Sequence, residues 1–339
     1  MNREDGESVF LEWCCRGEYL DDMTATERSM DMATRWPDLP LARWADTFAT
    51  LHMWTQIVGK TRLAHAPMVN HWWQVALYVT PRGLTTSAMP AGDGARSFAV
   101  DFDFIDHRLD VRASDGREAT IPLVAQTVSE YYAAYLAALR SIDLSADIRP
   151  VPVEVPVAIP FAEDREHASY DPGAAHACWV LLAQVHRVLE RFRGRFLGKS
   201  SPTHFFWGSF DLAQTRFSGR RAPRHGGGAP NCPDYVMVEA YSHECSSVGL
   251  WPGGPGMPGP ALYAYAYPEP AGYSTHRVQP SGASYHETMR EFILPLDVVR
   301  RAASPDDAIL DFAQSAYEAA AELGGWDRAA LERPRAEWP

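Results

Sequence analysis

Apolar residues recur along this chain with two different periods, which predict an alternation of helices and strands. Over residues 41–58, large apolar side chains return every three or four positions, as on one face of a helix, and Gly59 is expected to end that helix. The same period predicts further helices over residues 124–139, 174–197 and 308–323. The helical segments are therefore few and well separated.

Between these helices, apolar and polar residues alternate with the period of two that is typical of strands. The alternation is sharpest over residues 98–106, where apolar residues, mostly phenylalanine, alternate with aspartates. The predicted strands are residues 71–80, 84–89, 98–106, 204–211, 214–217, 235–241, 261–267 and 292–296. Short turns separate neighbouring strands, so we expect an α+β fold in which helices pack outside antiparallel sheets.

The order of the predicted elements occurs twice, as helix, several strands and helix. His71 and His204 each precede two aromatic residues, and each lies at the start of a segment of equal length that ends at a proline. We interpret this as an internal duplication whose halves form one compact unit; the alternative is coincidence among aromatic-rich strands. The expected divisions are an N-terminal extension (1–35), a first α+β half (36–143), a Pro-rich connection (144–170) and a second α+β half (171–330).

Composition and charge limit the class of protein. The chain has 339 residues, 46% of them hydrophobic and 22% charged, as in folded globular proteins. A net charge of −12 argues against nucleic acid as a partner, because such binders need a basic surface. No apolar run approaches a membrane span, and the N-terminus has no apolar signal core, so we expect a cytoplasmic protein without membrane contact.

Histidines near strand ends are the first candidates for chemistry, because imidazole is both a common metal ligand and a proton carrier. They are His71, His107, His204 and His243. We predict that His204 and His243, with the carboxylate of Glu244, bind one transition metal ion, iron or zinc, and that His71 is catalytic. Adjacent residues on a regular strand face apart, so such a centre requires several strands or a bulge. The alternative for each histidine is a structural imidazole.

A second candidate is an ion pair across the predicted hairpin between Asp211 and Arg216. An oriented guanidinium binds a carboxylate or phosphate in bidentate fashion, so both residues are predicted to be catalytic. Lys60, Arg62 and Arg82 precede or lie in the first hairpin, and together these basic side chains favour an anionic ligand. The alternative for the pair is a purely structural role.

Three tyrosines, Tyr263, Tyr265 and Tyr267, alternate with alanines on one predicted strand. They either line a pocket or pack against a helix. The leading functional hypothesis is an enzyme that acts on a small anionic molecule at a His-rich site between the two halves. A metal-dependent oxidoreductase or hydrolase is its preferred form. The alternatives are a non-catalytic binding protein with an aromatic pocket, and a structural partner protein.

Several long segments are similar to those of an uncharacterised bacterial family, a domain of unknown function. The segments are residues 56–63, 70–73 (NHWW), 82–86 (RGLTT), 204–223 (HFFWGSFDLA through TRFSGR to AP), 241–244 (YSHE) and 263–270. The resemblance extends over residues 36–330 and implies a single full-length domain. It implies no activity, cofactor or catalytic residue.

Overall fold

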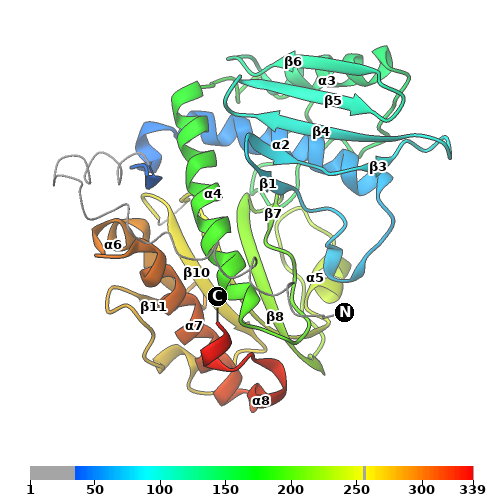
Figure 1. Cartoon of the computed structure of the whole chain (residues 1–339). Helices are drawn as coiled ribbons and strands as arrows, with labels where there is room; N and C mark the ends of the chain where they lie inside the picture. Colours follow the sequence, from blue (N-terminus) through cyan, green and yellow to red (C-terminus); the bar gives the residue numbers. More distant parts are fainter. Residues whose placement is uncertain (1–34, 255–256, 339) are drawn as a thin grey trace, which may run out of the picture.

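The structure, a computed structural model, describes residues 35–254 and 257–338 and has an α+β fold (Figure 1). The predicted N-terminal extension therefore lies outside the described residues, apart from its last position. Two antiparallel six-stranded sheets form the framework, and helices pack against them, as predicted. Within the described residues, no helix is both long and apolar enough to cross a membrane.

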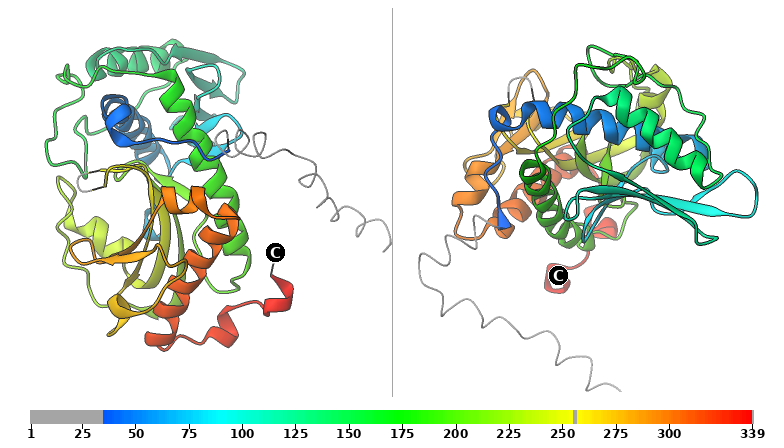
Figure 2. Two further views of the ribbon diagram at one scale, coloured as in Figure 1. Left: turned by 90° about the vertical axis from the view of Figure 1, so that its left-hand side faces the viewer. Right: turned by 90° about the horizontal axis from the view of Figure 1, so that it is seen from above.

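The first sheet is a meander with strand order β1-β2-β4-β5-β6, in which β3 pairs with β4. Its strands are β1 (Tyr78–Thr80), β2 (Gly83–Thr85), β3 (Met89–Pro90), β4 (Ser97–Asp103), β5 (Arg108–Ala113) and β6 (Glu118–Pro122). The 3-10 turns η1 (Leu41–Arg43) and η2 (Asn70–Trp72) precede it, and helices α2 (Ala45–His65) and α3 (Val128–Ser141) pack together on one side of it (Figure 2).

The second sheet has the strand order β11-β12-β10-β9-β8-β7. Its strands are β7 (His204–Phe206), β8 (Asp211–Arg221), β9 (His243–Trp251), β10 (Ala261–Tyr267), β11 (Ser284–His286) and β12 (Glu291–Pro295). The remaining elements are α4 (Pro172–Gly194), α5 (Asp234–Ala240), η3 (Tyr273–Thr275), α6 (Leu296–Arg301), α7 (Pro305–Leu323), α8 (Arg328–Leu331) and η4 (Arg335–Glu337). Helices α4 and α7 contact each other and cover one face of this sheet, whereas α5 lies at its other face (Figure 1).

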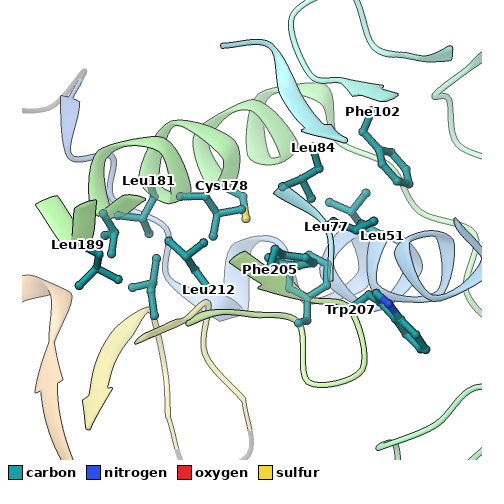
Figure 3. Packing of buried hydrophobic residues seen from close by; sticks show 14 of the residues in the cluster. Leu51, Leu77, Leu84, Phe102, Cys178, Leu181, Leu189, Phe205, Trp207 and Leu212 are labelled. Carbon is teal, nitrogen blue, oxygen red and sulfur yellow. The ribbon is translucent and has the colours of Figure 1, made fainter. Parts of the chain in front are cut away.

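The two sheets meet where their first strands lie side by side. Leu77 and Phe205 exchange two backbone hydrogen bonds, of 2.8 and 2.7 Å, next to β1 and β7. One hydrophobic cluster continues through this junction, and α4 crosses it with Cys178 and Leu181 pointing inward (Figure 3). Next to this junction, the indole N–H of Trp207 donates to the carbonyl of Val75 at 2.8 Å, which holds the segment after η2 against the second sheet.

Two predictions, one of a helix and one of a strand, need correction. The first helix does not end at Gly59 but continues as α2 to His65. Gly59 is required for a different reason: a β-carbon there would lie 2.2 Å from ring atoms of Trp207, so the helix can approach this ring only without a side chain. The predicted strand over residues 235–241 is in fact the short helix α5.

The predicted strand beginning at His71 is also wrong. His71 lies in η2, where His71 and Trp72 both have left-handed backbone angles, with φ of 58° and 60°, and pairing begins only at Tyr78. The proposed equivalents in the two halves thus differ in structure, because His204 lies on a regular strand. The internal duplication remains a prediction.

Candidate functional site

A cavity of about 380 Å³ lies on the face of the second sheet that carries α5. Alternate residues of β8, β9 and β10 form its floor, because side chains on a strand take turns between the two faces. These floor residues are Asp211, Ala213, Thr215, Phe217, Cys245, Ser247, Tyr263 and Tyr265. The volume falls within the range of small-molecule sites.

Two of the three tyrosines of β10 line the cavity rather than pack against a helix. Tyr263 and Tyr265 belong to the floor, while Ala264 between them lies in the main core on the opposite face. Tyr265 shares a hydrogen bond of 2.9 Å with Tyr241, so its hydroxyl is already engaged. Tyr267 is placed differently, since its hydroxyl donates to the carbonyl of Pro223. The cavity therefore has aromatic surfaces together with hydroxyl groups.

Asp211 lies at one end of this floor and is held by two hydroxyl donors. Ser209 donates to its Oδ1 at 2.5 Å, and Tyr263 donates to its Oδ2. Only 5% of Asp211 is exposed, and burial raises its pKa, although the two hydroxyl hydrogen bonds oppose this change. Both carboxylate oxygens accept, which is the arrangement of the ionised form. Asp211, predicted as catalytic, is thus a cavity residue.

Glu154 lies at the same end of the cavity, and no sequence pattern pointed to it. Burial, with the negative charge of Asp211, raises the pKa of Glu154 to about 7. Its carboxylate packs on Gly208, where an added β-carbon would lie 2.2 Å from Oε1. Its backbone has a φ of 59°, a conformation that costs energy in a residue with a side chain. Glu154 comes from the Pro-rich segment 144–170, which the sequence predicts to be a connection.

Gln56 of α2 holds the segment that carries Glu154. The buried Gln56 amide donates to the Val153 carbonyl and accepts from the Val153 N–H, both at 2.8 Å. The N–H of Glu154 donates to the carbonyl of Pro230 at 2.7 Å. The backbone groups of Val153 and Glu154 are therefore fixed, and the carboxyl group is held toward the cavity.

Lys60 and Arg149 are the basic residues of this end. Lys60 is only 5% exposed, and its ammonium group lies 5.6 Å from the centre of the Trp207 ring. Burial lowers the pKa of Lys60 to about 8, and the positive charge of Arg149 acts in the same direction. Among the described residues, neither side chain forms an ion pair. An anionic ligand would supply the missing partner.

His71 lies at the other end of the cavity. Its Nδ1 donates to the carbonyl of Ala240 at 3.0 Å, so Nε2 is left to accept from the ammonium group of Lys199 at 2.7 Å. This pattern belongs to neutral imidazole. Burial and the charge of Lys199 both lower the pKa of His71, in agreement with that form. The ring centre lies 5.5 Å from that of His243.

The predicted metal ligands do not converge. His204 is fully buried, and burial lowers its pKa to about 3. Glu244 points away from His243, as adjacent strand residues do, and pairs with Arg220 at 2.7 Å. Across residues 35–254 and 257–338, no three His, Cys, Asp or Glu side chains are placed to hold a metal ion. His204, His243 and Glu244 therefore do not fit an iron or zinc site.

The predicted ion pair between Asp211 and Arg216 is not formed. Residues five apart on a strand face opposite sides, and Arg216 accordingly lies under α4 and α7 with 1% exposure. Its guanidinium carbon is 3.4 Å from the Phe192 ring centre and 4.4 Å from that of Tyr317. It also donates to the Phe192 carbonyl. Arg216 is a core residue.

The other residues singled out from the sequence also lie elsewhere. Arg62 donates to the carbonyl of Gln74 at 2.6 Å, and Arg82 pairs with Asp103 at 2.6 Å. His107 shares a hydrogen bond of 2.8 Å with the hydroxyl of Tyr170. Of the basic residues predicted to favour an anion, Lys60 is the one that lines the cavity.

Comparison with known proteins adds a family but no activity. No curated protein and no solved structure matches the chain. A family of unknown function, DUF5996, matches residues 36–333, which include both sheets and every residue of the cavity. The match covers most of the sequence, and it contains the segments through which the resemblance was recognised. The chain belongs to this family of unknown function.

Proposed function

We propose that the protein is an enzyme that acts on a small anionic molecule by acid–base chemistry in the cavity. One observation carries this proposal: Glu154, Asp211 and Lys60 line the same cavity, and burial moves the pKa values of Glu154 and Lys60 to about 7 and about 8. Groups that titrate near neutral pH can both release and take up a proton there, which is what general acid–base catalysis requires.

The three residues take different roles. Glu154 exchanges a proton with the substrate, because close to neutral pH it is divided between its two forms. Asp211 stays ionised between Ser209 and Tyr263, and its charge favours the protonated form of Glu154. Because their environments differ, Glu154 can act as the proton donor while Asp211 remains its charged partner.

Lys60 supplies the binding of the anionic group. Its ammonium group has no carboxylate partner in the described part of the chain, and Arg149 adds a second positive charge at the same end. A ligand anion would offset the cost of burying that charge. Tyr265 and Trp73 provide flat apolar surfaces farther along the cavity, so the substrate is expected to have an apolar or ring-shaped body.

A non-catalytic binding protein is the second candidate function. The aromatic lining favours it, since such surfaces bind ligands without chemistry. The ionisable groups gathered at one end favour the enzyme. The metal-dependent form of the enzyme has no support from the positions of His204, His243 and Glu244, so no step is assigned to a metal.

The anion assignment is tested by a matched series of probes: phenylacetate, 2-phenylethanol and phenethylamine. We expect phenylacetate to raise the thermal unfolding temperature most, because a ligand that binds only the native state stabilises it. Replacing Lys60 with methionine should remove that advantage, whereas Arg140→Gln, at an exposed position of α3 outside the cavity, should keep it. Equal stabilisation by all three probes would contradict the assignment.

The enzyme is distinguished from the binding protein by turnover. Compounds that stabilise the protein in a metabolite screen are incubated with it and followed by mass spectrometry. Glu154→Gln should bind such a compound but convert none of it, because the amide carries no exchangeable carboxyl proton. Binding without conversion by the wild type would favour the binding protein instead.

A further inference from the structure

A second group of basic side chains lies beyond the His71 end of the cavity, where β8 ends and β9 begins. Arg221 and His243 are direct partners in the antiparallel register, so their side chains project on the same side of the sheet. The His243 ring lies 5.5 Å from that of His71, whose Nε2 is 2.7 Å from the ammonium group of Lys199. We call Lys199, Arg221 and His243 the basic corner.

The positive charge of the basic corner has little compensation. Among the described residues, neither Lys199 nor Arg221 forms an ion pair, and both are exposed. The hydrogen-bond partner of Lys199 is the neutral His71. His243 uses Nδ1 toward Ser242, at 3.1 Å, which leaves Nε2 open. Three donors therefore remain available to a ligand.

A basic residue next to the basic corner does have a carboxylate partner, so the lack of ion pairs does not extend to this neighbour. Arg220, one position before Arg221, pairs with Glu244 at 2.7 Å and donates to the carbonyls of Gly324 and Gly325. The carboxylate that faces the basic corner is Glu239, and it accepts a hydrogen bond of 3.0 Å from the backbone N–H of His71. Glu239 attracts Lys199 and His243 but lies beyond ion-pair distance of both.

The charges in the basic corner also oppose one another. Burial lowers the pKa of His243, and the positive charges of Lys199 and Arg221 lower it further, while Glu239 acts in the opposite direction. A bound anion would relieve this repulsion and favour the protonated form of His243. Binding of a dianion and protonation of His243 are therefore expected to assist each other.

We propose that Lys199, Arg221 and His243 bind a phosphate group, at a site separate from the anion position at Lys60. A guanidinium, an ammonium and an imidazole together offer several donors, which suits the several oxygens of a tetrahedral anion better than one carboxylate. The site lies outside the cavity, because none of the three residues lines it. His71 separates the two, since it lines the cavity and also contacts Lys199.

Titration calorimetry with inorganic phosphate at low salt tests the site, with acetate as the comparator. The wild type should bind phosphate more tightly than acetate. Arg221→Gln, Lys199→Met and His243→Asn should each weaken phosphate binding by about tenfold or more, since each removes one charge-assisted hydrogen bond. The matched control is Arg140→Gln, because Arg140 is an exposed arginine on α3 with no ion pair in the described structure.

Two further measurements test whether phosphate binds at the basic corner rather than elsewhere on the protein. In Lys60→Met, phosphate should still shift the NMR signals of the His243 ring as it does in the wild type, so failure of the cavity assignment and failure of the basic corner are distinguishable. The NMR signals of the His243 ring should shift with phosphate, while those of the exposed His286, on the edge strand β11, should stay in place. Unchanged phosphate affinity in all three corner variants, or equal affinity for acetate, would overturn the proposal.

Discussion

Replacing Glu154 with glutamine is predicted to stabilise the folded protein at alkaline pH and to have no effect in acid. In the unfolded chain this carboxyl group titrates near its ordinary pKa of 4.5, whereas in the folded protein the pKa is about 7. Between these values the folded state binds the extra proton, so the stability contributed by Glu154 is complete below the lower value and is lost as pH rises through the upper one.

The magnitude follows from the two pKa values. A difference of this size, at about 1.36 kcal/mol for each pH unit, amounts to about 3 kcal/mol of lost stability once Glu154 is ionised in both states. Glutamine has nearly the same shape and no charge, so it avoids both the desolvation of a carboxylate and the repulsion from Asp211. The variant should therefore gain about this amount above about pH 8.

Urea unfolding of the wild type and Glu154→Gln, measured from about pH 4 to about pH 9, provides the assay. Glu163→Gln is the control, because Glu163 lies in the same Pro-rich segment but is exposed. The two stability curves should meet in acid and separate with rising pH, whereas the control should follow the wild type. A constant offset between the wild type and Glu154→Gln over the whole range would refute the raised pKa.

Three further predictions concern packing around the site and in the core. Gly59→Val should lower the free energy of unfolding by about 1–3 kcal/mol, because its side chain overlaps the Trp207 ring; Gly226→Ala, in open space, should leave it unchanged. Gln56→Leu should cost about 3 kcal/mol in urea unfolding, because two backbone groups of the Glu154 segment lose their partners. Arg216→Met should leave thermal stability unchanged or raise it, because this buried charge has no carboxylate partner; a loss of several kcal/mol would contradict this.

Local pattern was sufficient for much of the fold. Helices α3, α4 and α7 lie where apolar residues recur every three or four positions, and β4 and β10 lie where they alternate. These patterns succeed because each element buries one face, and burial selects the side chains of that face. Asp211 and Arg216 were predicted to pair across a hairpin, but both belong to the single strand β8, in which residues five apart lie on opposite faces.

Other features depend on contacts between distant segments. From the local sequence, Gly59 is expected to end the helix. In the structure, its lack of a side chain instead allows the ring of Trp207, which is distant in sequence, to pack against the helix. Residues 235–241 have the composition of a strand, yet as α5 they are fastened to η2 by hydrogen bonds from His71 and Trp72. Tertiary contacts of this kind override the weak local preference of a short segment.

The sequence by itself determined the α+β class, most of the helices, the face of β10 that carries the tyrosines, and Asp211 as a candidate. The tertiary structure alone decided that Glu154, from a segment resembling a linker, lies with Asp211 and Lys60 in one cavity, and that the predicted metal ligands lie apart. The reason is physical. Periodicity records which side of an element is buried, whereas the pKa of a carboxyl group depends on charges and burial supplied by segments that meet only when the chain has folded.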